Sequence, residues 1–168
     1  MRIRTCITID APPAAVWADV KHLDRHVEWM RDAKSIHAVE PAGRRRKLRL
    51  PRRRSAKPPS PRNRRRTGVG AEFECVTGVG PLTTTDVLVV REWRPRRAIG
   101  ISHEGAVRGL GRFTLRRRRG GRTRFCWHEL LRFPWWMGGP LGEVLARPLL
   151  RAIWTGNLRR LKARIERG

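Results

Sequence analysis

The chain has 168 residues, which is enough for one domain and barely enough for two. Hydrophobic residues make up 39% of the sequence, and this share excludes a wholly disordered protein. The formal net charge is +25, and the segment 44–66 alone holds 13 basic residues and no acidic one. Arginine outnumbers lysine 34 to 5, a bias that GC-rich coding or nucleic-acid binding would explain.

Targeting signals and cysteine usage point to the cytoplasm. Prolines and charged residues interrupt the longest apolar stretch, 133–154, so no segment reaches the ~18 to 20 apolar residues of a membrane span. The N-terminus leads into a strand pattern rather than the apolar core of a signal peptide. Cys6, Cys75 and Cys126 are isolated and odd in number, so the sequence predicts no disulfide framework and no metal site. We expect a cytoplasmic protein without a transmembrane segment, and its oligomeric state is left open.

The first quarter of the chain predicts a strand followed by two short helices. Apolar and polar residues alternate over Arg2–Ile9, as in a half-buried strand. The two prolines at 12 and 13 end that strand and open a helix at 14–20, because proline is tolerated in a first helical turn. A second short helix is predicted at 23–29 and a weak strand at 35–39.

The basic segment 44–66 has four prolines and no aromatic residue. It offers too little apolar surface to offset the entropy of ordering, so we predict a disordered insertion. Five further strands follow, at 71–77, 83–93, 98–103, 110–116 and 123–131.

The last segment changes to a helical period. Its apolar stripe recurs at spacings of three and four residues, over Leu150, Trp154, Leu158, Leu161 and Ile165. Pro148 is expected either to kink this helix or to begin its long part. We predict one α+β domain over 1–168, a curved antiparallel sheet of about seven strands wrapped on the C-terminal helix.

Several strings in this order carry a resemblance to a known superfamily. They are the segment 7–17 with Trp17, the segment 27–30, Phe113-Thr114-Leu115 before a glycine-rich turn, and Thr123-Arg124-Phe125. They resemble the START-like, Bet v 1-like superfamily, and specifically its polyketide cyclase/dehydrase-related branch, over 1–41 and 67–168. The resemblance implies a helix-grip fold with an internal pocket for apolar or amphipathic small molecules. The basic segment 44–66 departs from this pattern, because in the superfamily a short turn usually joins the second and third strands.

If the strand alternation holds, one sheet face is mostly apolar and aromatic, as in a small-molecule pocket. A filled core is the other reading of the same pattern. The candidate ligand-binding residues are Phe73, Cys75, Ile101, Phe113, Leu115, Phe125, Trp127 and Leu131 on the sheet, with Trp135, Trp136 and Trp154 beyond it.

His103 and Glu129 are the two titratable side chains on that face, and they are the candidate catalytic pair. They lie two strands apart, so their backbones are roughly 10 Å from each other and their side chains can flank one ligand. A carboxylate and a histidine in such a place suit the acid–base chemistry of a cyclase or dehydratase. The alternative is structural, with Glu129 paired to an arginine and His103 bonded to a backbone carbonyl.

Trp135 and Trp136 stand in the loop before the C-terminal helix. Because adjacent tryptophans are costly to expose, they are expected to plug the cavity end, to form a movable lid, or to dip into a membrane interface.

Three function hypotheses remain. The first is binding of a hydrophobic small molecule, polyketide-like or lipid-like, and the second is an aromatase/cyclase or dehydratase that uses His103 and Glu129. The third is a nucleic-acid or ribosome-associated protein in which 44–66 binds RNA, DNA or acidic lipid. An insertion of no defined role, or a coding oddity, also explains 44–66. No cofactor or metal is expected, because the sequence shows no phosphate loop or metal cluster.

Overall fold

The computed structural model describes residues 1–39, 67–80 and 82–168. The segment 44–66, where we predict a disordered insertion, lies outside these residues. None of the described helices has the length and apolar character that a membrane crossing requires.

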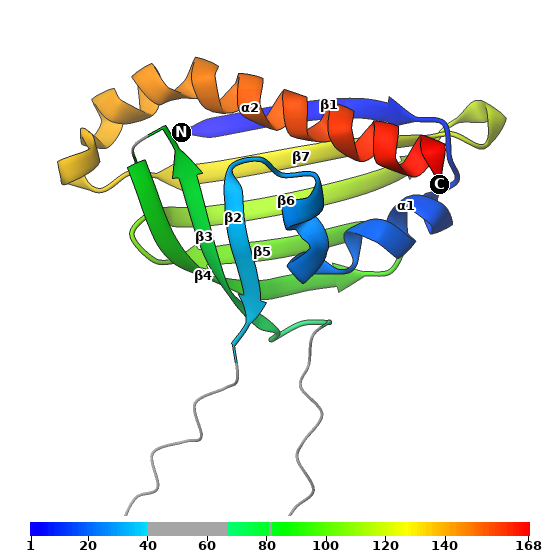
Figure 1. Ribbon diagram of the computed structural model, residues 1–168, viewed down its shortest axis with the longest axis horizontal. Coiled ribbons are helices and arrows are strands. Elements are labelled where there is room, and N and C mark those ends of the chain that lie inside the picture. Colours follow the sequence, from blue (N-terminus) through cyan, green and yellow to red (C-terminus); the bar gives the residue numbers. More distant parts are fainter. Residues whose placement is uncertain (40–66, 81) are drawn as a thin grey trace, which may run out of the picture.

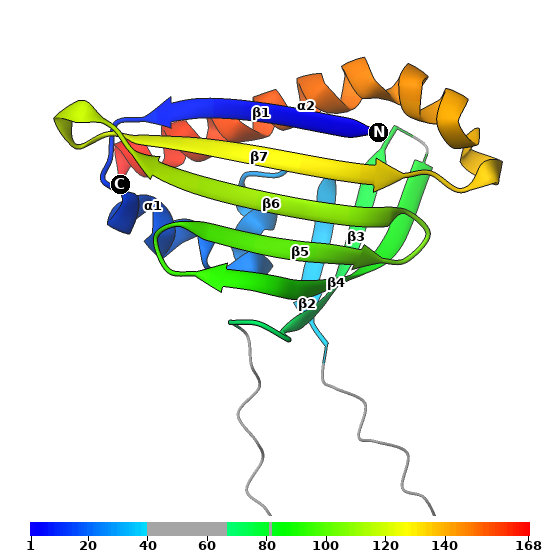
Figure 2. The ribbon, with the colours of Figure 1, turned by 180° about the vertical axis from the view of Figure 1, so that it is seen from behind.

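Seven antiparallel strands form one strongly curled sheet (Figures 1 and 2), in the order β1-β7-β6-β5-β4-β3-β2. This confirms the predicted sheet. The strands are β1 Arg2–Ile9, β2 Ala33–Ala38, β3 Glu72–Val79, β4 Leu82–Arg94, β5 Ala98–Glu104, β6 Arg108–Arg117 and β7 Thr123–Arg132.

One long-range pairing shapes the sheet. β1 pairs with β7, the last strand, while each of the strands from β2 to β7 lies beside the next one along the chain. The N-terminal strand therefore becomes an edge of the sheet, and β2 is the other edge.

The long helix α2, Gly139–Arg167, runs along β1 on the concave side of the sheet (Figure 1). Its C-terminal half buries Trp154, Leu158 and Leu161, and Leu150 and Ile165 are partly buried against the same core. The predicted stripe is thereby confirmed. Pro148 lies within the helix, so the long part does not begin there.

Short helices close the rest of the concave side. α1, Pro13–Val20, buries Val16, Trp17 and Val20, and the 3-10 helix η1, Leu23–Glu28, stands where the second helix is predicted. Two further 3-10 turns, η2 (Arg119–Gly121) and η3 (Trp135–Met137), lie at the β6–β7 hairpin and before α2.

The structure corrects the expectation that no disulfide forms. Cys6 on β1 lies directly opposite Cys126 on β7, and the two are joined in a disulfide across 120 residues of chain. Cys75 is free and buried. Sequence spacing did not reveal the pair, because the β1–β7 pairing brings together two strands from opposite ends of the chain.

Trp154 joins α2 to the sheet through both packing and a hydrogen bond. Its ring stacks on Trp127 with centroids 5.1 Å apart, and its Nε1 donates to Asp32 Oδ2 at 3.2 Å. Asn157, one turn further along α2, donates from Nδ2 to Asp32 Oδ1 at 2.6 Å. The helix is therefore held by a buried carboxylate as well as by apolar contact.

Trp154→Ala should lower the free energy of unfolding by about 3 to 5 kcal/mol, because it removes a buried aromatic ring and leaves Asp32 short of a donor. Leu149→Ala, on the exposed side of the same helix, is the matched control and should change it by less than about 0.5 kcal/mol. Urea denaturation of both variants measures the difference. A loss below about 1 kcal/mol for Trp154→Ala would contradict this packing.

Candidate functional site

The predicted pocket face exists as one surface, but its centre is filled by side chains. Phe113 lies between Phe125 and Trp127, with ring centroids 5.3 Å from each, and Trp29 closes over Trp127 at 6.1 Å. Seven of the eight sheet residues in the predicted lining are buried, namely Phe73, Cys75, Phe113, Leu115, Phe125, Trp127 and Leu131. These side chains form the core.

At one part of the concave face the side chains are only partly buried. Two side chains in the second half of β5, Ile101 and His103, are only partly buried. Phe133 and Met137, in the loop before α2, are also partly buried against the same core. The concave face is thus partly accessible at the end where β5 turns into β6.

His103 and Glu129 meet at this more open end. Nε2 of His103 lies 3.4 Å from Oε2 of Glu129, and the exposed fractions of the two side chains are 18% and 4%. The other oxygen, Oε1, accepts a hydrogen bond of 2.6 Å from Trp127 Nε1. The carboxylate is therefore oriented by an indole on one side and faces an imidazole on the other.

Gly111 explains how two side chains from non-adjacent strands meet. It lies on β6, directly opposite both Ile101 on β5 and Glu129 on β7. A Cβ at this position would lie 2.5 Å from Glu129 Oε1 and 2.9 Å from Ile101 Cγ1. Because glycine has no side chain, the carboxylate can lean across β6 toward His103.

The electrostatics of the pair favour a charged histidine. Burial opposes the imidazolium, but contact with Glu129 and the charge of Asp86 outweigh it, so the pKa of His103 lies above its ordinary value. Asp86 is itself buried on β4 and accepts a hydrogen bond from the backbone nitrogen of Val107. The site thus presents a protonated donor beside a carboxylate acceptor.

Four buried polar atoms have no hydrogen-bond partner among the described residues: Thr5 Oγ1, Trp29 Nε1, His103 Nε2 and Glu129 Oε2. Thr5 is the cross-strand neighbour of Trp127, and Trp29 packs against the same ring. The unpaired atoms therefore surround the aromatic cluster and its Glu129 end. Such groups normally find a partner in a folded protein, so a polar molecule is chemically suited to this region.

The other predicted site residues lie elsewhere. Trp135 and Trp136 are on the surface, with 87% and 55% of their area exposed, so they do not plug the cavity end. Cys75 is buried near Asp32 and Asp86, and burial together with these charges raises the pKa of its thiol to about 12. Such a thiol does not act as a nucleophile near neutral pH.

Sequence reasoning missed Asp32 and His26. Asp32 stands in no motif, and its role follows only from its contact with α2. His26 is buried between Trp29 and Phe113, and burial lowers its pKa to about 4. Its neutral ring donates from Nε2 to the carbonyl of Val20 at 2.8 Å, so it is a structural histidine.

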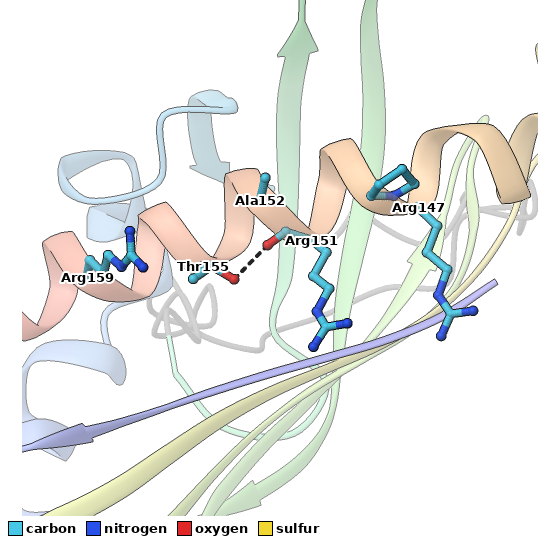
Figure 3. A pocket seen from close by; sticks show the side chains of 6 residues that line it. Arg147, Arg151, Ala152, Thr155 and Arg159 are labelled. Carbon is cyan, nitrogen blue, oxygen red and sulfur yellow. Dashed lines mark hydrogen bonds between the residues drawn. The ribbon is translucent and has the colours of Figure 1, made fainter.

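Two hollows stand out among the described residues, and both lie outside the concave face. One, of about 520 Å³, follows α2 beside Arg147, Arg151 and Arg159 (Figure 3). The other, of about 640 Å³, lies at the β6–β7 hairpin. No group of three or more histidine, cysteine or acidic side chains in the described ranges is arranged to hold a metal ion.

The raised pKa of His103 predicts a pH-dependent contribution to stability. The His103–Glu129 contact stabilises the fold fully below pH ~6.5, the ordinary histidine value, and this contribution is lost as the pH rises through the raised pKa. The free-energy difference between the wild type and His103→Asn should therefore be larger near pH 6 than near pH 9. Urea denaturation at both pH values measures it.

His37→Asn is the control for this comparison, because His37 is exposed on β2. It should show no comparable dependence on pH. A difference for His103→Asn that stays constant, or that grows as the pH rises, would contradict the charged pair.

The whole fold is shared with known structures. No family model and no curated protein matches the sequence. The structure is similar to TTHA0849 from Thermus thermophilus, with a TM-score of 0.70 at 18% identity over 98% of this chain and 97% of that one.

Two aromatase/cyclases are also similar in structure. Zhui from Streptomyces sp. R1128 has a TM-score of 0.66 at 14% identity, over 99% of this chain and 94% of its own. The di-domain aromatase/cyclase StfQ of the steffimycin pathway has a TM-score of 0.62 at 15% identity, over 98% of this chain and 44% of its own. With these similarities and the topology described above, the chain has the helix-grip fold of these structures.

Proposed function

We propose that the chain binds a hydrophobic small molecule, polyketide-like or lipid-like, at the open end of the concave face. The observation that carries the proposal is the His103–Glu129 pair, largely buried at the edge of an aromatic cluster. Its two facing atoms lie 3.4 Å apart and make no hydrogen bond to any other described residue. Apolar surface with a few oriented polar groups is the usual composition of a ligand site. The structural likeness to two aromatase/cyclases supports the same ligand class.

The chemistry of the pair indicates which polar groups the ligand carries. A protonated His103 Nε2 donates to a carbonyl oxygen, and Glu129 Oε2 accepts from a hydroxyl. A ligand with a phenol and a carbonyl close together satisfies both atoms. Because the centre of the face is filled, this ligand contacts Ile101 and His103 first, rather than lying beneath Trp154.

1,8-Dihydroxyanthraquinone is a suitable probe, since it carries phenols and carbonyls on an apolar ring system. Glu129→Gln and His103→Asn should each weaken its binding about tenfold, because loss of a hydrogen bond to a charged group is worth about 1.5 kcal/mol or more. Fluorescence titration measures the affinities. Anthracene, which lacks the polar groups, should bind the wild type and the variants equally.

The matched controls are Glu74→Gln and His37→Asn, which make the same chemical changes at exposed positions. They should leave the affinity unchanged. Equal affinities of all four variants for the dihydroxyanthraquinone would remove the pair from the site, and no binding by the wild type would refute the ligand class.

Catalysis is the second candidate, and the 3.4 Å contact between a base and a protonated acid favours it. In a dehydration, Glu129 would take the proton α to a carbonyl. The electron pair would form the C=C bond as the β C–O bond breaks, and His103 would protonate the leaving hydroxyl to give water. Proton transfer from Glu129 to His103 would then restore the pair.

A β-hydroxyketone with an aromatic ring tests this reaction, because its enone product absorbs in the near ultraviolet. Turnover that falls at least a hundredfold in both Glu129→Gln and His103→Asn would support an enzyme. Binding of the ketone without any turnover by the wild type would leave a binding protein and refute the dehydratase. The hypothesis that 44–66 binds RNA, DNA or acidic lipid concerns residues outside the described part and stays a prediction.

A further inference from the structure

Arginines collect at the β6–β7 hairpin, at one end of the sheet (Figure 2). Five of them line the hollow of about 640 Å³ together with Cys6, Ile7 and Thr8 of β1. We call this set the hairpin arginines; its members are Arg117, Arg118, Arg119, Arg122 and Arg124. The hairpin projects from one end of the sheet, opposite the end where α2 begins (Figure 2).

The register of the strands brings like charges together here. Arg116 on β6 lies directly opposite Arg124 on β7, and Arg117 opposite Thr123. Like charges in directly opposed positions destabilise a sheet. The fold therefore tolerates an unfavourable concentration of positive charge at this hairpin.

No carboxylate relieves that charge within the described residues. The ion pairs of the sheet's outer face involve Glu92 and Glu104, which bind Arg112, Arg94 and Arg91 instead. Arg122 Nε donates only to the carbonyl of Arg119 in its own turn, at 3.3 Å. The guanidinium groups at the hairpin are thus available to an external anion.

The positive potential extends along the outer face. His128, on β7, has its pKa lowered by partial burial and by the charges of Arg4, Arg112 and Arg116. These groups belong to β1 and β6, the strands on either side of β7. A basic strip therefore runs from the hairpin along β7 and its two neighbours.

We propose that the hairpin arginines and this strip bind the phosphodiester backbone of a nucleic acid. A row of arginines matches a chain of phosphates, because each guanidinium can bind a phosphate through two parallel hydrogen bonds. The surface is separate from 44–66, so the inference does not rest on the basic segment.

The composition of the strip argues for backbone contact rather than base recognition. Among the described residues, the exposed large apolar side chains of β6 and β7 are Leu110 and Leu130. The aromatic rings of these two strands are buried, so the strands offer no ring for bases to stack on. Recognition by phosphates alone is independent of sequence.

A membrane is the less suitable occupant of the hairpin. The exposed apolar side chains that would enter a bilayer, such as Trp135, Leu141 and Leu145, lie at η3 and the start of α2. That region is at the opposite end of the molecule from the hairpin (Figures 1 and 2). The hairpin itself offers charge without an apolar anchor.

Two triple variants of the full chain separate a specific surface from net charge. Arg117, Arg119 and Arg122 are replaced by serine in the first, and Arg147, Arg151 and Arg159 in the second. All six are exposed, and the second set lies along one stretch of α2 (Figure 3). Each variant loses three positive charges and keeps 44–66, so the contribution of that segment is the same in both.

Binding of a fluorescent 20-base-pair DNA duplex is measured by anisotropy between 50 and 300 mM KCl. The hairpin variant should bind about tenfold or more weakly at 150 mM, and the slope of log affinity against log salt should fall by about 2 to 3, or roughly 0.9 per phosphate released. The α2 variant should lose less than threefold, with its slope unchanged.

Equal losses in the two variants would show that only net charge matters, and no loss in the hairpin variant would place binding elsewhere. Either result overturns the proposal. Weaker binding of the hairpin variant to phosphatidylserine vesicles, with DNA binding unchanged, would assign the surface to a membrane and also overturn it. Arg→Lys at the same three hairpin positions keeps the charge, and retained binding there excludes misfolding as the cause of the loss.

Discussion

The contact between α2 and the sheet holds the rest of the structure in place. α2 lies beside β1, an edge strand, and the ring of its Trp154 reaches Trp127 at the centre of the concave face. Asp32 fixes the same ring from the β2 side by accepting its N–H. One side chain therefore connects the helix, the last strand and the segment before β2, and the aromatic cluster forms around it.

The same cluster decides what remains available for function. Because Phe113, Phe125 and Trp127 fill the centre of the face, polar chemistry is confined to its end, where Gly111 lets Glu129 approach His103. The polar pair belongs to the strands that form the core, so the position of its carboxylate depends on the packing of Trp127. Fold and candidate site are thus one continuous arrangement.

Sequence reasoning reached the fold because its signals are periodic. Alternation over β1 and β7, and the stripe through Trp154 and Leu158, record which side chains face the core. It identified His103 and Glu129 for the same reason, since both fall on the inward face of their strands. It placed their backbones about 10 Å apart and expected the side chains to flank one ligand. The direct contact of the side chains was not predicted, because the approach of Glu129 over Gly111 depends on packing and not on the strand period.

The other features that the sequence did not predict also depend on packing between distant elements. The Cys6–Cys126 disulfide requires the β1–β7 register, and the importance of Asp32 requires the position of α2. For Trp135 and Trp136 the sequence left burial and exposure open, and only the path of the chain into α2 places them outside. Such features depend on where elements meet in space, which local patterns do not record.

Charge is divided between the two sides of the sheet. The concave side holds buried carboxylates, Asp86 and Glu129, beside His103, whereas the hairpin and outer strands carry arginines. A protein with a formal charge of +25 can therefore present an acidic interior and a basic exterior at once. The two proposed activities use different residues and opposite electrostatics, so they do not compete for the same side chains.

The central claim is that a ligand's polar groups meet His103 and Glu129 at the open end of the concave face. Nuclear magnetic resonance of the five histidine side chains during titration with 1,8-dihydroxyanthraquinone tests it most directly. The ring resonances of His103 should shift with saturating ligand, while those of exposed His37 should not. Saturable binding that leaves the His103 resonances unchanged would contradict ligand contact with this pair.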